Sequence, residues 1–213
     1  IDKYSFLLSF MNLILNGIYN PYIQKDDFFT GYPVMESVDL VVCHPPFGRK
    51  VSPKGFYNEV SPYPDYPISR IEYAFLQHML PSVKEDGEFA IVIPTDILSD
   101  SGTNREFRKY LVESDYINSV VGLPERSMPN TSVKAAILYG TIRQHPRIDP
   151  KVEFSVIRNS STQSFTQSES QIDHLWDNRD SIEVSVSDIL KLGVSLNPES
   201  YTSVKFATML RYM

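Results

Sequence analysis

The feature that most constrains the fold is a short apolar run that ends in two consecutive prolines. The run, residues 38–43, has the length of a strand and one charged residue, so it predicts a buried β-strand. Neither Pro45 nor Pro46 can donate a backbone hydrogen bond to a sheet, so the strand must end there in a sharp turn. Ligands bind outside the carboxyl ends of strands in open α/β sheets. The turn and the ring of Phe47 therefore either form the floor of a reaction site, or the turn only ends the strand.

Segments of helix and strand character alternate along the chain, which predicts an α/β fold with a doubly wound sheet. Helices are expected at 4–18, with a broad buried face and a cap at Gly17, at 70–80, and after a Thr103-x-x-Glu106 capping box. Strands are expected from 22–23 to 26–27 and at 38–43, 88–94, 116–123, 133–142 and 152–157, with a turn at 86–87. Too few residues join 116–123 to 133–142 for a helical crossover, so this pair is predicted to be antiparallel. If 38–43 and 88–94 are parallel neighbours, residues 94–96 lie near the proline turn.

Composition narrows the class of protein. Hydrophobic residues make up 42% of the 213 residues and charged residues 22%, which is ordinary for a globular chain. No apolar run reaches the roughly 20 residues that span a bilayer, so no membrane partner is expected. The single cysteine excludes an internal disulfide framework and fits a cytoplasmic location. The net charge of −6 has the wrong sign for a chain that grips nucleic acid mainly by itself.

The segment that follows the proline turn is a long loop. Four prolines between residues 51 and 69 disfavour regular structure there. Its tyrosines, Tyr57, Tyr63 and Tyr66, either stack on a ligand base or pack onto their own domain. The basic residues Arg49, Lys50 and Lys54 are either a local patch for an anionic partner or solvated loop charges.

Several segments, in order, resemble S-adenosyl-L-methionine (AdoMet)-dependent DNA adenine-N6 methyltransferases, specifically the modification subunits of type I restriction systems. The similar segments are 10–17, 44–48, 72–78, 87–98, 121–124, 131–138 and 196–201, and together they extend over most of the chain. The resemblance implies a Rossmann-like methyltransferase sheet that is mostly parallel with a terminal antiparallel hairpin. It also implies a partial catalytic domain at 1–145, lacking its first strands, and a partner-facing extension at 146–213.

The resemblance assigns roles to two groups of residues. His44, Pro45, Pro46 and Phe47 match the catalytic Asn-Pro-Pro-Phe motif, in which the Asn oxygen and the first proline carbonyl accept the hydrogens of adenine N6. The ring at Phe47 would then stack on a base flipped out of the duplex. The acidic residue that contacts the adenine of AdoMet matches Asp27 better than Asp26, with Phe28 as an aromatic wall. DNA, a specificity subunit and possibly a restriction subunit are the implied partners.

The sequence departs from the family pattern at the first motif residue. His44 stands where the family has Asn, and a neutral imidazole offers only one acceptor nitrogen. The glycine-rich loop of the AdoMet site is expected ahead of Ile1, so a fragment that is inactive alone is expected. Two alternatives stay open: a catalytically dead binding module in a restriction or defence complex, and a protein-glutamine methyltransferase, whose motif is also Asn-Pro-Pro. No metal site is expected, because Cys43 and His44 alternate across a strand.

Overall fold

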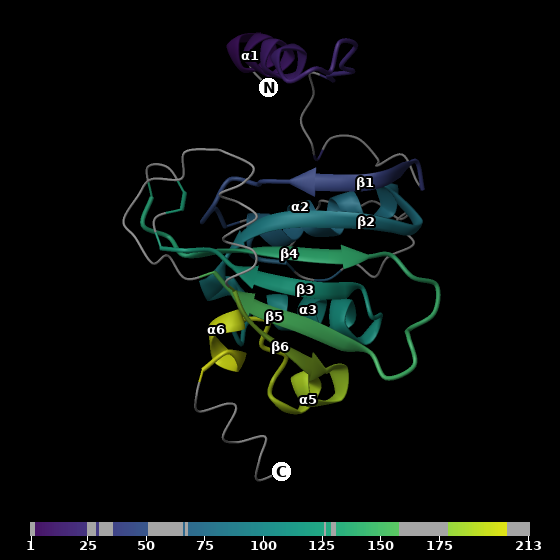
Figure 1. Cartoon of the computed structure of the whole chain (residues 1–213), viewed down its shortest axis with the longest axis vertical. Coiled ribbons are helices and arrows are strands. Elements are labelled where there is room, and N and C mark those ends of the chain that lie inside the picture. The colour runs from purple at the N-terminus through teal and green to yellow at the C-terminus, as the bar shows by residue number, and fades with distance from the viewer. Residues whose placement is uncertain are drawn as a thin grey trace. The chain divides into compact units, whose positions relative to one another are not determined.

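The computed structural model describes residues 3–24, 29, 36–50, 66, 68–125, 127–128, 131–157 and 179–203. The chain forms two compact units, Ile1–Pro33 and Val34–Met213. The first contains helix α1, and the second contains the other helices and the strands of the described residues (Figure 1).

Helix α1, Lys3–Leu15, ends at the predicted glycine cap, but the face that the sequence predicts to be buried is not buried. Gly17 has a φ of 88°, and the amide of Ile18 donates to the carbonyl of Leu13 at 3.0 Å, which is a Schellman closure. None of the residues of α1 is buried, so the predicted buried face is wrong for this structure. Helical spacing shows which side chains can be covered together, but it does not supply the surface that covers them. Residues 21–24, where the strand predicted to run from 22–23 to 26–27 begins, form no regular element, and the rest of that predicted strand lies outside the described residues.

A six-stranded sheet forms the centre of the second unit (Figure 1). Its strands, in spatial order, are β1 (Val38–Cys43), β2 (Val83–Pro94), β4 (Ala135–Thr141), β3 (Ile117–Gly122), β5 (Lys151–Val156) and β6 (Asp180–Ser185). β1 and β2 are parallel and β3 and β4 antiparallel, which confirms both pairing predictions. The described sheet is an open, Rossmann-like α/β sheet, but it is mixed: β4 runs against both β2 and β3, and β6 runs against β5. Only β1–β2 and β3–β5 pair in parallel among the described strands, fewer than expected.

Strand β1 is an edge strand of the described sheet, and this changes its burial. None of its residues is buried, and the side chains of Leu40 and Val42 are 54% and 73% exposed. The prediction of a buried strand was therefore wrong, because an apolar run does not reveal whether neighbours cover it. On β2, the turn predicted at 86–87 is a bulge within a longer strand: Asp86 has a φ of 60°, and the pairing with β1 shifts there.

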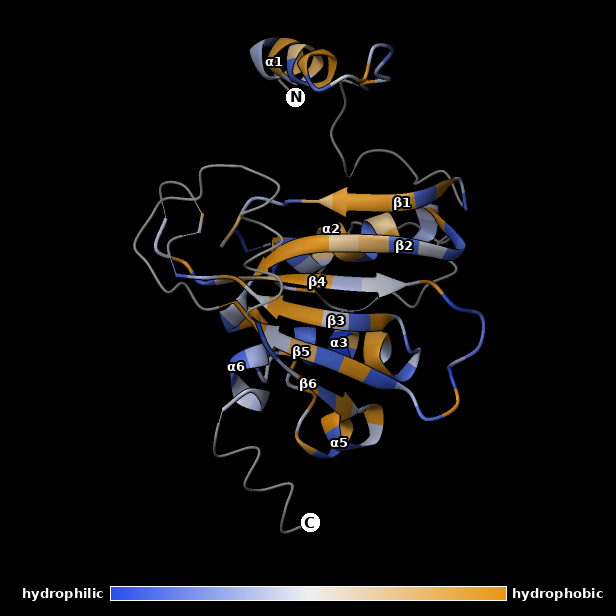
Figure 2. Ribbon diagram, viewed as in Figure 1, coloured by the Kyte–Doolittle hydropathy of each residue, from blue (hydrophilic) through white to orange (hydrophobic). Residues whose placement is uncertain are grey.

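Helices α2 (Ile71–Met79) and α3 (Asn104–Glu113) lie on one side of the sheet, behind it in Figure 1. The core lies between these helices and the strands, and Figure 2 shows hydrophobic residues along β1 and β2 and on parts of β3 and β4. Its fully covered side chains include Tyr73, Leu76, Phe89, Ile91, Ile93, Phe107 and Leu111. The short helices are η1 (Leu80–Ser82), η2 (Thr95–Leu98), α5 (Val186–Lys191) and α6 (Pro198–Tyr201). None of the helices in the described ranges is long and apolar enough to cross a bilayer.

The start of α3 differs from the predicted capping box. Thr103 is itself helical and its side chain makes no capping hydrogen bond. The buried side chain of Asn104 makes other contacts there: its Oδ1 accepts from the amide of Ser69 at 3.0 Å, and its Nδ2 donates to Asp100 at 2.8 Å. The contact with Ser69 joins the start of α3 to the segment that precedes α2, 35 residues earlier.

The region after residue 145 continues the same sheet. β5 pairs with β3, β6 pairs with β5, and α6 packs on β5 and β3. The buried guanidinium of Arg108 on α3 also binds this region, since its Nε donates to the carbonyl of Val194 at 3.2 Å. The division at 145/146 and the partner-facing role of the later part stay predictions.

Candidate functional site

The proline turn after β1 presents its aromatic ring to solvent and keeps one proline buried. Pro45 is buried, Pro46 and His44 are exposed, and Phe47 is half-buried. The rings of His44 and Phe47 lie 5.3 Å apart between centroids at 60°. Phe47 is therefore not part of the core, and the turn holds two rings side by side at the carboxyl end of β1.

The far side of the turn is fixed to the start of α2 by two hydrogen bonds. The amide of Gly48 donates to the Glu72 carboxylate at 2.7 Å, and the amide of Ile71 donates to the carbonyl of Arg49 at 3.0 Å. Gly48 has a φ of 78°, a left-handed conformation that other residues adopt at a cost. The backbone that carries Phe47 is thus held from the helix and not only by its own prolines.

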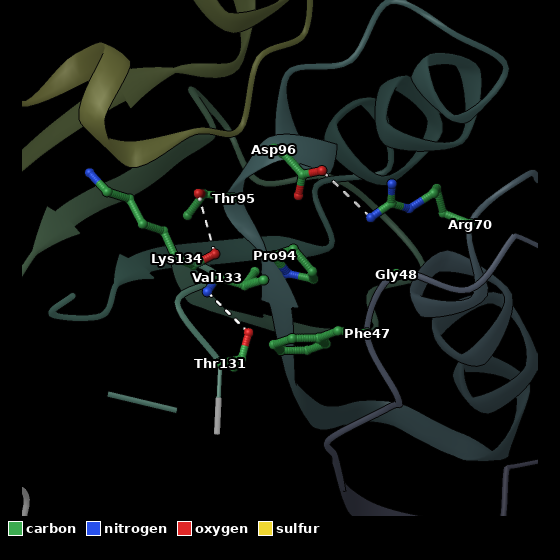
Figure 3. A pocket seen from close by; sticks show the side chains of 9 residues that line it. All are labelled: Phe47, Gly48, Arg70, Pro94, Thr95, Asp96, Thr131, Val133 and Lys134. Atoms are coloured by element: carbon green, nitrogen blue, oxygen red, sulfur yellow. Dashed lines mark hydrogen bonds and ion pairs between the residues drawn. The ribbon is translucent and has the colours of Figure 1, made fainter. Parts of the chain in front are cut away.

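Phe47 and Gly48 line one part of an open cavity of about 600 Å³ (Figure 3). The other lining residues come from the start of α2, the carboxyl end of β2 and the segment that leads into β4: Arg70, Pro94, Thr95, Asp96, Thr131, Val133 and Lys134. Parallel pairing of β1 with β2 brings the two carboxyl ends to one edge of the sheet. Residues 94–96 therefore lie at the same cavity as the proline turn, which confirms that prediction.

The cavity wall carries charges of both signs. Arg70 Nη2 lies 3.6 Å from Asp96 Oδ2, and the Asp96 side chain is 66% exposed. Lys134 Nζ lies 3.1 Å from carboxylate oxygens of both Glu125 and Glu199. These hydrogen bonds raise the pKa of the Lys134 amine above its ordinary value, so it stays protonated. Each cation of the wall is already paired with an acid, so the wall is polar without being a strongly basic surface.

The structure brings together part of the predicted site. His44, Pro45, Pro46 and Phe47 form one turn, and Phe47 lies at the cavity. Asp26, Asp27 and Phe28 lie outside the described residues, as do Lys54, Tyr57 and Tyr63. Their predicted roles stay predictions.

Two of the alternatives in the loop region can be resolved further. Tyr66 packs against Phe107 and Tyr110 of α3, with ring centroids 5.7 and 5.5 Å apart, so it is a packing residue. Arg49 and Lys50 are exposed.

Burial raises the pKa of the Cys43 thiol to about 11, so this cysteine is a protonated, weakly nucleophilic group beside the turn. Among the residues with described positions, no three His, Cys, Asp or Glu side chains cluster as a metal site would require.

Sequence reasoning missed several residues of the site. Arg70, Thr131 and Lys134 line the cavity, and Glu72 binds the turn, but none was predicted as a site residue. A glutamate in the first turn of a helix is ordinary, so Glu72 gave no signal. The segment 131–134 stood out only through its resemblance to the family, and its place at the cavity depends on β4 lying beside β2.

Comparison with known proteins gives one consistent result. The family model for N-6 DNA Methylase matches residues 1–205. The type I restriction enzyme HindI methylase subunit of Haemophilus influenzae is 25% identical over 142 residues, which are 62% of this chain and 31% of that protein. The EcoEI methylase subunit of Escherichia coli is 29% identical over 142 residues, which are 63% and 28%. The chain thus spans about a third of the length of these relatives.

Solved structures show the same fold. The type I restriction-modification system methyltransferase subunit from Streptococcus thermophilus superposes with a TM-score of 0.72 at 23% identity, over 93% of this chain and 46% of that one. The type I restriction enzyme EcoKI M protein superposes with a TM-score of 0.64 at 15% identity, over 99% and 56%. The fold of this chain is therefore shared with these structures.

Proposed function

Because the chain belongs to the N-6 DNA Methylase family, we propose that its cavity receives an adenine extruded from DNA for methylation at N6. The observation that carries this proposal is the position of Phe47, a partly exposed ring on an open cavity at the carboxyl ends of parallel strands. A flipped base can stack on such a ring, whereas a ring packed in the core could not receive one. The relatives are methylase subunits of type I restriction enzymes, which supports a role in restriction-modification.

The motif residues would act on the exocyclic amine of the base. Its lone pair is delocalised into the purine ring, so the site must hold the nitrogen in line and accept its hydrogens. The carbonyl of Pro45 and the acceptor nitrogen of a neutral His44 are the groups that would accept them. Phe47 would hold the plane of the base. Burial of Pro45 and the Gly48–Glu72 hydrogen bond keep these acceptors in place.

AdoMet would supply the methyl group as an electrophilic donor. The residues assigned to its adenine end by resemblance, Asp26, Asp27 and Phe28, lie outside the described residues. The donor therefore rests on family membership, and the chain's own contribution is to orient the acceptor base beside it.

DNA and a specificity subunit, with a restriction subunit, are the proposed partners. The net charge is −6, and the acid pairing of Arg70 and Lys134 leaves the described cavity wall little free positive charge for the phosphate backbone. A partner subunit that binds the duplex would supply this positive charge, and the relatives are themselves subunits of multi-component enzymes. A protein that works on DNA in this way would act in the cytoplasm of a bacterial or archaeal cell.

The test is methyl transfer by the complete gene product that contains this chain. The protein, with its specificity subunit, is incubated with AdoMet and DNA, and N6-methyladenine is measured by mass spectrometry. Phe47→Ala is expected to lower kcat/KM roughly 5- to 150-fold, since stacking on an aromatic ring is worth about 1 to 3 kcal/mol per base. His44→Asn restores the family motif and is expected to match or exceed the wild-type rate. Ile148→Ala, at a fully exposed position, is the control.

Two results would decide against the proposal. If neither the wild-type protein nor His44→Asn methylates any adenine, the chain is not a methyltransferase. Retained binding to the specificity subunit in that case would favour the alternative of a catalytically dead binding module.

A further inference from the structure

Glu72 is a fully buried carboxylate at the start of α2, in direct contact with the proline turn. A buried carboxylate is costly unless hydrogen bonds and charges compensate for its lost hydration. One of its oxygens accepts from the amide of Gly48 at 2.7 Å, a length typical of a charge-assisted hydrogen bond. Its other oxygen lies 3.5 Å from Nε of Arg70. Both oxygens are therefore directed at groups of the site.

The contacts of Glu72 extend from the turn to the opposite wall of the cavity. Arg70 bridges from Glu72 to the exposed carboxylate of Asp96, which follows β2. Gly48 and Asp96 both line the cavity (Figure 3). One polar chain thus joins the backbone next to Phe47 with a side chain at the end of a neighbouring strand, and the buried Glu72 is its central member.

We propose that Glu72 is the positioning residue of this site. It holds the Gly48 amide, which fixes the backbone that carries the Phe47 ring. Glu72 acts on the reaction only through these groups. The consequence for catalysis rests on the proposed methyltransferase function, whereas the restraint on Gly48 does not.

Three substitutions at Glu72 separate the effect of its side-chain length from the effect of its charge. Glu72→Gln keeps the length and one acceptor oxygen, so it should still accept from Gly48. Glu72→Asp keeps the charge but is one methylene shorter, so it should lose contact with the turn. Glu72→Ala removes both. The matched controls are Glu113→Gln and Glu113→Ala, at an exposed position near the end of α3.

The first measurement is hydrogen exchange of the Gly48 amide, followed by NMR in this chain. Glu72→Ala and Glu72→Asp are expected to speed its exchange at least tenfold, while Glu72→Gln and the Glu113 variants leave it near the wild-type rate. Unchanged protection of Gly48 in Glu72→Ala or Glu72→Asp would overturn the proposal. If Glu72→Ala does not fold, the pair Glu72→Asp and Glu72→Gln decides the matter.

The second measurement is methyl transfer by the complete gene product with its specificity subunit. Because displacement of a site by about 1 Å can cost 10²-fold, Glu72→Asp is expected to lower kcat roughly 10- to 100-fold with KM for AdoMet changed less than threefold. Glu72→Gln is expected to keep at least a third of kcat. The opposite order, an active Glu72→Asp and an inactive Glu72→Gln, would overturn the proposal, because charge and not reach would then matter. A wild-type protein without activity would refute the proposed function, and Gly48 exchange would still test the restraint.

Discussion

Gly140 lies near the carboxyl end of β4, between β2 and β3, at a position where the sheet leaves no room for a side chain. A Cβ atom there would lie 2.0 Å from the carbonyl oxygen of Tyr116 and 2.5 Å from the ring of Phe89. Phe89 is fully buried, so its ring has no solvent to move into. The Tyr116 carbonyl accepts the amide of Thr141 at 2.9 Å, so moving it breaks a hydrogen bond of the sheet. Gly140→Ala therefore has two costs, one of packing and one of hydrogen bonding.

The two costs can be added because they concern different atoms. Overpacking a core position costs about 1 to 3 kcal/mol, and leaving a buried polar group unpaired costs about 1 to 3 kcal/mol, so the sum is about 2 to 6 kcal/mol. For a chain of this length about 1 kcal/mol corresponds to 2–4 °C in Tm, so a mid-range loss lowers Tm by roughly 8 to 16 °C.

Thermal unfolding followed by circular dichroism measures the effect. Gly102→Ala is the control, because nothing lies within 4 Å of a Cβ at that exposed glycine, and it should change the free energy of unfolding by less than about 0.5 kcal/mol. Adding Phe89→Leu to Gly140→Ala should recover no more than the packing cost, since the Tyr116 carbonyl is still displaced. A Gly140→Ala protein that melts within about 2 °C of the wild type would refute the reasoning.

Two further predictions concern ionisable groups. Burial alone would raise the pKa of the Asp115 carboxyl, but hydrogen bonds from Arg147, at 2.8 Å from each oxygen, outweigh burial and hold that pKa below its ordinary value. The stability from this pair is therefore present above about pH 4 and lost as pH falls through the lowered pKa, so Asp115→Asn should flatten the decline of Tm between about pH 4 and pH 2. An unchanged slope would contradict this. Cys43 is partly buried and has a pKa of about 11, so it should react with iodoacetamide at pH 8 roughly 100-fold more slowly than a free cysteine peptide, and equal rates would contradict the raised pKa.

The sequence by itself determined the features that depend on near neighbours. The prolines after β1 end the strand whatever surrounds it, and the apolar runs of β2, β3 and β4 need only local patterning to be identified. The short connection between β3 and β4 forces an antiparallel pair. These inferences were confirmed because chain stiffness, periodicity and loop length are properties of consecutive residues.

Tertiary structure alone decided what each element meets. The Ser69–Asn104 and Gly48–Glu72 hydrogen bonds join residues 35 and 24 positions apart. The place of residues 131–134 at the cavity follows from β4 lying against β2, and the exposure of β1 follows from its edge position. All of these features have one physical reason. Burial and long-range hydrogen bonds depend on which surfaces lie against each other in the folded chain, whereas a sequence pattern shows only which surfaces are suited to such contacts.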